Sequence, residues 1–130
     1  YYKALKKLIE DYRLINRVYF YDVEDDLREI YCLSEVILNL SSKPEAFGMK
    51  LLQAAMMEKK IAGWNHGGSG EILEMCFPRG KVEFNNFDSL AKKIKELAES
   101  EEVPKNVFLT STLLHEKTVS FYLDALNKNY

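Results

Sequence analysis

The stretch from Ser41 to Glu71 most constrains the fold of this chain, because loop, helix, strand and loop follow one another within it. One apolar run, from Glu35 to Leu40, precedes the stretch, and a second, from Lys60 to Trp64, lies inside it. Both runs are short and apolar enough to be strands buried on both faces, as in a parallel sheet covered by helices. Parallel strands deliver their following loops to one edge of the sheet. We therefore expect a polar ligand at that edge.

The loop after the first of these strands carries Pro44 and Glu45 and leads into a helix. Pro44 fixes its own φ and favours an extended Lys43, so the chain must turn just before Glu45. Apolar residues then recur at helical spacing, at Phe47, Leu51, Leu52, Ala55 and Met56. The first turn, with Gly48 and Met49, offers unpaired amides and the positive end of the helix dipole. We predict an anion site there, with Glu45 at its rim.

Seven residues separate Glu45 from Gln53. If most of that separation is helical, the two side chains lie roughly 12 Å apart. A nucleoside diphosphate sugar is about that long between its hexose and its ribose, so an elongated donor could meet both side chains. The spacing leaves a second reading open, in which Glu45 is an exposed loop residue and Gln53 is a half-buried helical one.

The second strand is followed by a glycine-rich segment from Asn65 to Glu71. Its three glycines allow positive φ and a close approach of the backbone to a ligand. We expect Ser69 to cap a helix that runs from about Gly70 to Met75. From the residues alone, Glu71 is a first-turn acid that satisfies the helix dipole.

The remaining pattern predicts further elements on both sides. Upstream, these are an amphipathic helix from Tyr1 to Leu14, a strand from Arg17 to Tyr21, and a helix from Asp26 to Leu33 capped by Asp25. Downstream, they are a strand from Lys81 to Phe84, a helix capped by Asp88, a charged linker from Glu99 to Lys105, and a last helix from about Thr110.

Composition excludes several classes of protein. The formal net charge is −2 and basic residues alternate with acidic ones, so there is no electrostatic footprint for nucleic acid. No apolar run is long enough to span a bilayer and no signal peptide opens the sequence, so we expect a cytoplasmic protein. Cys32 and Cys76 are expected to be buried free thiols, and neither they nor His66 and His115 have metal-ligand spacing. We expect no metal and no cofactor.

Several spaced motifs resemble the C-terminal, donor-binding domain of retaining glycosyltransferases with the GT-B fold. The matching strings are S-x-x-E-A-F-G, A-A-M-M-x-x-K-x-I-A, G-G-S-G-E-I, RVYFYDVEDDLREIYCLSEVILNLS and FDSLAKKIKEL. The resemblance extends over residues 1–130 and implies an α/β fold, a Rossmann-like parallel sheet with flanking helices, as part of that domain. It also implies transfer of a hexose from a nucleotide-diphosphate sugar to a glycan or lipid-linked acceptor, with retention, in polysaccharide or lipopolysaccharide biosynthesis.

The same resemblance implies a role for each residue of the first loop and helix. Glu45 would be the catalytic-site residue that contacts hydroxyls of the donor sugar. Phe47, Gly48 and Met49 would present backbone amides to the sugar and phosphate. Gln53 takes the place of a second glutamate that holds the ribose. Glutamine lacks the charge that strengthens a carboxylate's hydrogen bonds, so weaker donor binding or another nucleotide preference is implied.

Two further segments take donor-binding roles by resemblance. Gly67, Gly68 and Glu71 would contact the sugar and phosphate end of the donor. The loop from Tyr21 to Val23 would lie beside the nucleotide base, although an ordinary acidic loop explains its composition equally well. Helix N-termini would stabilise the departing diphosphate electrostatically, without acid-base work by a side chain.

The resemblance also implies an acceptor domain and diphosphate-binding Gly-Arg and Lys residues on the N-terminal side. Neither is found in this sequence, which begins at Tyr1. We therefore expect a truncated domain that is inactive alone, from an enzyme attached peripherally to the inner face of the membrane. In the strand order 3-2-1-4-5-6, two strands would separate the run from Arg17 to Tyr21 from the run from Glu35 to Leu40. The alternatives are a non-catalytic nucleotide-sugar-binding or scaffold domain, which Gln53 favours, and a sugar-nucleotide epimerase of the same fold.

Overall fold

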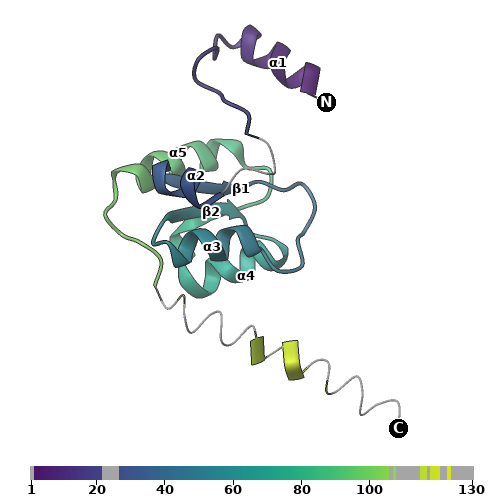
Figure 1. Cartoon of the computed structure of the whole chain (residues 1–130), viewed down its shortest axis with the longest axis vertical. Helices are drawn as coiled ribbons and strands as arrows, with labels where there is room; N and C mark the ends of the chain where they lie inside the picture. Colours follow the sequence, from purple (N-terminus) through teal and green to yellow (C-terminus); the bar gives the residue numbers. More distant parts are fainter. Residues whose placement is uncertain are drawn as a thin grey trace.

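The computed structural model describes residues 2–21, 27–105, 107, 115–116, 118–120 and 123. The elements follow one another as α1 (Tyr2–Asp11), α2 (Leu27–Leu33), β1 (Val36–Asn39), α3 (Met49–Met56), β2 (Lys60–Trp64), α4 (Gly67–Cys76), the 3₁₀ helix η1 (Pro78–Gly80), β3 (Lys81–Val82) and α5 (Phe87–Glu99). Figure 1 shows α2, α5 and the helices α3 and α4 gathered around the sheet, with α1 set apart from them.

Three parallel strands form the sheet, in the order β1-β2-β3. The register of β1 on β2 ends with Asn39 opposite Gly63, and β3 continues beside the end of β2, where Trp64 lies opposite Val82. Because all three strands run in one direction, the loops after them leave from the same edge. The predicted α/β fold, a parallel sheet flanked by helices, is confirmed.

The core lies around β2, between two layers of helices. Figure 1 shows α3 and α4 on one side of the sheet and α5 on the other. The most deeply buried large side chains are Trp64, Leu51, Ile61, Ile72, Leu73 and Leu97. Burying one such aliphatic side chain contributes about 1.5–3 kcal/mol relative to leaving it exposed, so these residues hold the three strands and the helices in one unit.

The predicted strand from Arg17 to Tyr21 is wrong. Residues 18–21 have no regular secondary structure and are exposed, and no described strand pairs with them. Aromatic and β-branched residues favour a strand only where a neighbouring strand supplies hydrogen bonds and packing. No such neighbour borders this segment among the described strands, so its composition does not produce a strand.

Two predicted helix caps are also wrong. Helix α4 begins at Gly67 with His66 as its N-cap, so Ser69 lies inside the first turn and Glu71 lies beyond it. The reading of Glu71 as a first-turn acid is therefore incorrect. Helix α5 is capped by Asn86, whose Oδ1 accepts a hydrogen bond of 3.0 Å from the amide of Ser89. Asp88 instead occupies the first turn of that helix.

Smaller differences concern element ends and one thiol. Helix α1 ends at Asp11 and strand β3 ends at Val82, both earlier than predicted. Cys76 is buried as expected, whereas Cys32 is exposed; the buried residue of the short helix α2 is Tyr31. The predicted cap Asp25 and the predicted start of the last helix at Thr110 lie outside the described residues.

Candidate functional site

Glu45 and the glycine-rich segment lie in direct backbone contact at the carboxyl edge of the sheet. The amide of Gly68 donates a hydrogen bond of 2.7 Å to the carbonyl oxygen of Glu45. A Cβ atom on Gly67 would lie 2.7 Å from the same oxygen, and one on Gly68 would lie 2.6 Å from the carbonyl oxygen of Ala46. Only glycine allows this approach. The structure therefore brings together the two loops that the parallel topology predicts to meet.

The N-termini of α3 and α4 meet at the same place. Gly48 is the N-cap of α3 with φ 64°, and a Cβ atom there would lie 2.9 Å from the backbone nitrogen and Cα of Ser69 in α4. No side chain caps either helix. Each N-terminus has the positive end of a helix dipole and first-turn amides without a partner inside the helix, of which that of Gly68 is bonded to Glu45. Two adjacent, uncapped N-termini make a favourable environment for an anion.

A pocket of about 450 Å³ opens beside the start of α4. Its lining residues are Asn65, His66, Gly67, Gly70, Glu71, Glu74 and Lys81. Gly67 and Glu71, both predicted site residues, thus face one cavity. An ion pair between Lys81 and Glu74 joins the end of α4 to β3 at its wall. The cavity therefore presents backbone, carboxylate, imidazole and ammonium groups to a polar ligand.

Asn39 is a polar site residue that the sequence reasoning missed. It ends β1 and is 8% exposed. Its Nδ2 donates hydrogen bonds to Glu45 Oε2 at 2.9 Å and to Ser69 Oγ at 3.0 Å, and its Oδ1 accepts one from the amide of Ser41 at 3.2 Å. The signal in the sequence is a single amide within the otherwise apolar run EVILNL.

The other predicted site residues fall into two groups. Phe47 and Met49 flank Gly48 and are 48% and 51% exposed, so their side chains are accessible beside the N-cap of α3. Gln53 is exposed on α3. Within the described ranges, neither Gln53 nor Tyr21 has a hydrogen bond or ring contact to the glycine-rich segment. Val23 lies outside the described residues.

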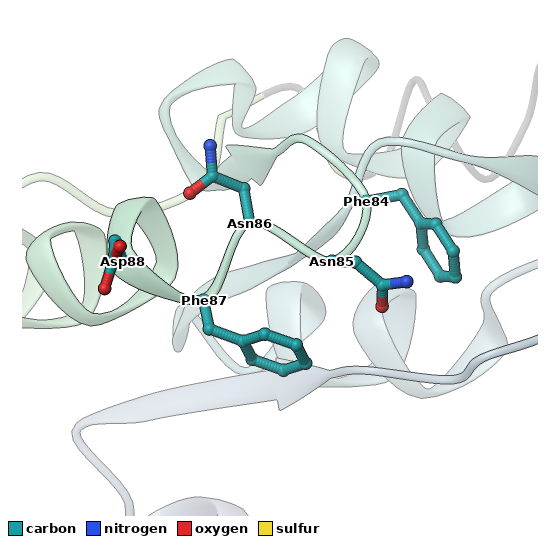
Figure 2. A pocket seen from close by; sticks show the side chains of 5 residues that line it. All are labelled: Phe84, Asn85, Asn86, Phe87 and Asp88. Carbon is teal, nitrogen blue, oxygen red and sulfur yellow. The ribbon is translucent and has the colours of Figure 1, made fainter.

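A second pocket, of about 440 Å³, follows β3 and is lined by Phe84, Asn85, Asn86, Phe87 and Asp88. Figure 2 shows the two phenylalanine rings on one side of the loop with the amide of Asn85 between them. The buried ring of Trp64 packs edge-on against Phe84 and Phe87, with centroids 6.0 and 5.4 Å apart. The ring of His66 lies 4.8 Å from that of Phe84, so this aromatic cluster adjoins the start of α4.

The buried thiol of Cys76, at the end of α4, is not poised as a nucleophile. Burial raises the pKa of the Cys76 thiol to about 11, against a smaller lowering by its backbone hydrogen bond. The thiol donates to the carbonyl oxygen of Ile72 at 2.9 Å, so Cys76 is an inert core residue at neutral pH. A search of the described part of the chain finds no group of three or more His, Cys, Asp or Glu side chains placed to hold a metal ion.

The helices within the described ranges include none with both the length and the apolar content to cross a bilayer.

Among known proteins, the chain is similar to a synthase and to a glycosyltransferase of known structure. The chain is 27% identical over 104 residues to N-acetyl-alpha-D-glucosaminyl L-malate synthase of Bacillus anthracis, a match that covers 80% of this chain and 27% of that protein. It superimposes on the crystal structure of a glycosyltransferase from Rickettsia africae with a TM-score of 0.65 and 30% identity, over 73% of this chain and 25% of that one. The chain thus spans about a quarter of the length of each relative.

The family described as glycosyl transferases group 1 matches residues 1–125, nearly the whole sequence. Its members are enzymes of sugar transfer, and the parallel sheet with its loops at one edge is the Rossmann-like arrangement that the motifs of this chain imply. The chain therefore belongs to the group 1 glycosyltransferase family.

Proposed function

We propose that this chain is the C-terminal, donor-binding part of a retaining transferase that moves a hexose from a nucleotide-diphosphate sugar. One observation carries the proposal. The uncapped N-termini of α3 and α4 touch at Gly48 and Ser69, and the Glu45 loop is hydrogen-bonded to the same turn of α4. A site with two positive helix ends and one adjacent carboxylate suits a ligand that joins a diphosphate to a sugar.

In this proposal, the first-turn amides around Gly48 and Met49, with that of Gly67, hold the diphosphate and stabilise its charge as it leaves. Gly68, whose amide donates to the carbonyl oxygen of Glu45, keeps the Glu45 loop beside them. The carboxylate of Glu45 accepts hydrogen bonds from sugar hydroxyls, and Glu71 contacts the donor from the adjoining pocket. Gln53 meets the ribose, and the segment with Tyr21 and Val23 meets the base. The helix ends supply the positive field, so the proposed transfer uses no metal.

The acceptor in this proposal is a glycan or a lipid-linked sugar in polysaccharide or lipopolysaccharide assembly, at the cytoplasmic face of a membrane. An acceptor domain on the N-terminal side completes the enzyme. The Bacillus anthracis relative is named as a synthase of N-acetyl-alpha-D-glucosaminyl L-malate. A small organic acid is therefore the second candidate acceptor. A non-catalytic sugar-nucleotide-binding domain is the second candidate function, because the exposed Gln53 stands where the family's ribose-binding glutamate is expected.

The test uses the protein at its full encoded length, a panel of UDP-, GDP- and ADP-hexoses, and the Glu45→Ala variant. Loss of charged hydrogen bonds from Glu45 should lower kcat/KM by about 10- to 100-fold. Glu99→Ala, which removes an exposed glutamate at the end of α5, is the matched control and should keep full activity. NMR of the product should show the anomeric configuration of the donor.

Three outcomes would count against the proposal. Absence of binding to every nucleotide sugar would remove the donor site. Binding without transfer would favour the non-catalytic domain. Full turnover by Glu45→Ala would remove Glu45 from the catalytic site.

A further inference from the structure

We infer that Asn39 is a positioning residue that holds the carboxylate of Glu45 and the first turn of α4 in one fixed arrangement. The inference rests on the proposed donor site and gives a role to a residue to which the motifs of the chain assign none. It is carried by hydrogen bonds that link three separate segments, which are the end of β1, the Glu45 loop and helix α4.

The side-chain amide of Asn39 uses both of its N–H donors and its oxygen in these links. Its two N–H groups match two acceptors, Glu45 Oε2 at 2.9 Å and Ser69 Oγ at 3.0 Å. Its oxygen accepts from the amide of Ser41 at 3.2 Å. These partners define which end of the amide is the oxygen. A flipped amide would turn its NH₂ group towards the N–H of Ser41 and its oxygen towards the Glu45 carboxylate.

The backbone of Asn39 is held as firmly as its side chain. Asn39 lies opposite Gly63 in the β1–β2 ladder, and a Cβ atom on Gly63 would lie 2.6 Å from the carbonyl oxygen of Asn39. A polar group on a buried strand end is more precisely placed than one on a loop. Asn39 therefore transmits the rigidity of the sheet to Glu45, which itself lies in a loop.

The bond to Asn39 orients the Glu45 carboxylate for a ligand. Only Oε2 is engaged; among the described residues, none donates a hydrogen bond to Oε1. Oε1 is thus available to a sugar hydroxyl. The same amide holds Ser69, whose backbone touches the N-cap of α3. Asn39 therefore sets the spacing between the hydroxyl-binding carboxylate and the anion-binding helix ends.

The decisive variant is Asn39→Asp, measured in the full-length protein with the donor that supports transfer. At pH 8 the new carboxylate would repel Glu45, and kcat/KM should fall about 10- to 100-fold. As the pH is lowered towards about 5.5, a proton shared between the two carboxyl groups restores an O–H donor, so activity relative to the parent should recover. Asn39→Ala, which has no donor, should stay low at every pH.

Other ionisable groups on the neighbouring segments do not affect the ratio of variant activity to parent activity. They are Lys43 beside Glu45, Lys50 on α3, and His66, Glu71 and Glu74 at or on α4. All are present in both the parent and the variant, so their titration cancels in the ratio of the two activities. Asn16→Asp, the same change at an exposed position in the N-terminal segment, is the matched control and should show a constant ratio.

A double-mutant cycle separates positioning from a general structural role. If Asn39 acts through Glu45, Asn39→Ala should add less than about a 3-fold loss in the Glu45→Ala background. Should Asn39→Asp fail to fold, Asn39→Ser keeps one short donor and should lose less activity than Asn39→Ala.

Additive losses in the cycle, or an Asn39→Asp loss that does not change with pH, would overturn the inference and leave the proposed donor site standing. Unchanged activity of Asn39→Ala would do the same. A parent protein that binds no nucleotide sugar would overturn both.

Discussion

Two amphipathic helices of this chain, α1 and α5, differ in whether their apolar side chains are buried. Helix α5 buries Leu90 and Leu97 against the sheet, whereas no residue of α1 is buried. Leu8 on α1 is 50% exposed. The contacts of α1 are local, such as the edge-on contact of Tyr2 with Phe20 at 4.9 Å and of Lys6 with the Tyr2 ring at 4.6 Å. An apolar stripe thus predicts a helix but does not choose its partner.

The difference follows from chain connectivity. Helix α5 leaves the end of β3 and returns across the sheet, so its apolar face meets the core. Helix α1 precedes the exposed residues 12–21, and Figure 1 shows both apart from the α/β body of residues 27–105. Of the three predictions below, the first compares the body with the N-terminal segment (residues 2–21), and the other two rank contacts inside the body.

The largest expected effect comes from one leucine in each region. Leu97→Ala in α5 should lower the free energy of unfolding by about 2–5 kcal/mol, because it leaves a cavity in the core. Leu8→Ala in α1, the same chemical change at a half-exposed site, should cost less than about 0.5 kcal/mol. Urea unfolding followed by circular dichroism measures both. Equal losses would break the comparison and show that α1 packs against the body in solution.

A smaller effect is expected from backbone contacts inside the body. A Cβ atom at Gly68 would lie 2.6 Å from backbone atoms of Ala46 and Phe47, whereas the nearest atoms at Gly70 are the side-chain oxygen of Asn65 at 3.1 Å and its backbone carbonyl carbon at 3.2 Å. Gly68→Ala should therefore destabilise by about 1–3 kcal/mol. Gly70→Ala, the matched control, should change stability by less than about 1 kcal/mol, because its contacts require only a small shift of Asn65 and alanine favours a helix.

Thermal and urea unfolding of the two glycine variants would give this comparison. If Gly70→Ala proved the more damaging of the two, the contact between the Glu45 loop and α4 would be looser than the structure shows.

The smallest effect is expected from an exposed cluster of ion pairs between η1, α5 and the segment after α5. Arg79 on η1 bonds Glu96 on α5 at 2.5 Å and Glu102 at 2.7 Å. The hydrogen bond from Arg79 lowers the pKa of both carboxyl groups, with a further lowering of that of Glu96 by Lys93. Their stabilisation is therefore present above the ordinary glutamate pKa of 4.5 and is lost as the pH falls through the lowered values.

The variant Arg79→Gln should accordingly show a lower urea midpoint than the parent at pH 7, and the difference should close in acid. Because these groups are exposed and screened, the effect should be smaller than that of Gly68→Ala. Lys95→Gln, at an exposed position of the same helix α5, should show no such pH-dependent gap. A gap that stayed constant with pH would mean that Arg79 acts through packing.

Much of the site was predictable because it depends on topology. Parallel strands at Glu35 to Leu40 and at Lys60 to Trp64 place their following loops at one edge, which is why Glu45 and Gly67 meet. The start of α4 was not predictable in the same way. Ser69 is a good cap by type, but Gly68 bonds the carbonyl oxygen of Glu45 and the helix begins three residues before the predicted start.

The role of Asn39 could not be predicted from the sequence either. In the sequence, its amide is a polar side chain in an otherwise apolar strand. The neighbouring residues of that strand have no side chain to which it could form a hydrogen bond. Its partners Glu45 and Ser69 lie 6 and 30 residues away along the chain. Hydrogen bonds across such separations depend on how the segments pack, which local pattern does not encode.

By itself, the sequence determined the α/β class, the places of the three strands along the chain and the loops that carry polar residues, because hydrophobic period and turn residues act locally. Only the tertiary structure decided that α1 lies free of the core, that residues 17–21 leave the sheet, and that Asn39 joins Glu45 to α4. These outcomes depend on which surfaces meet, and burial and hydrogen bonding reward a contact only once distant segments are in place.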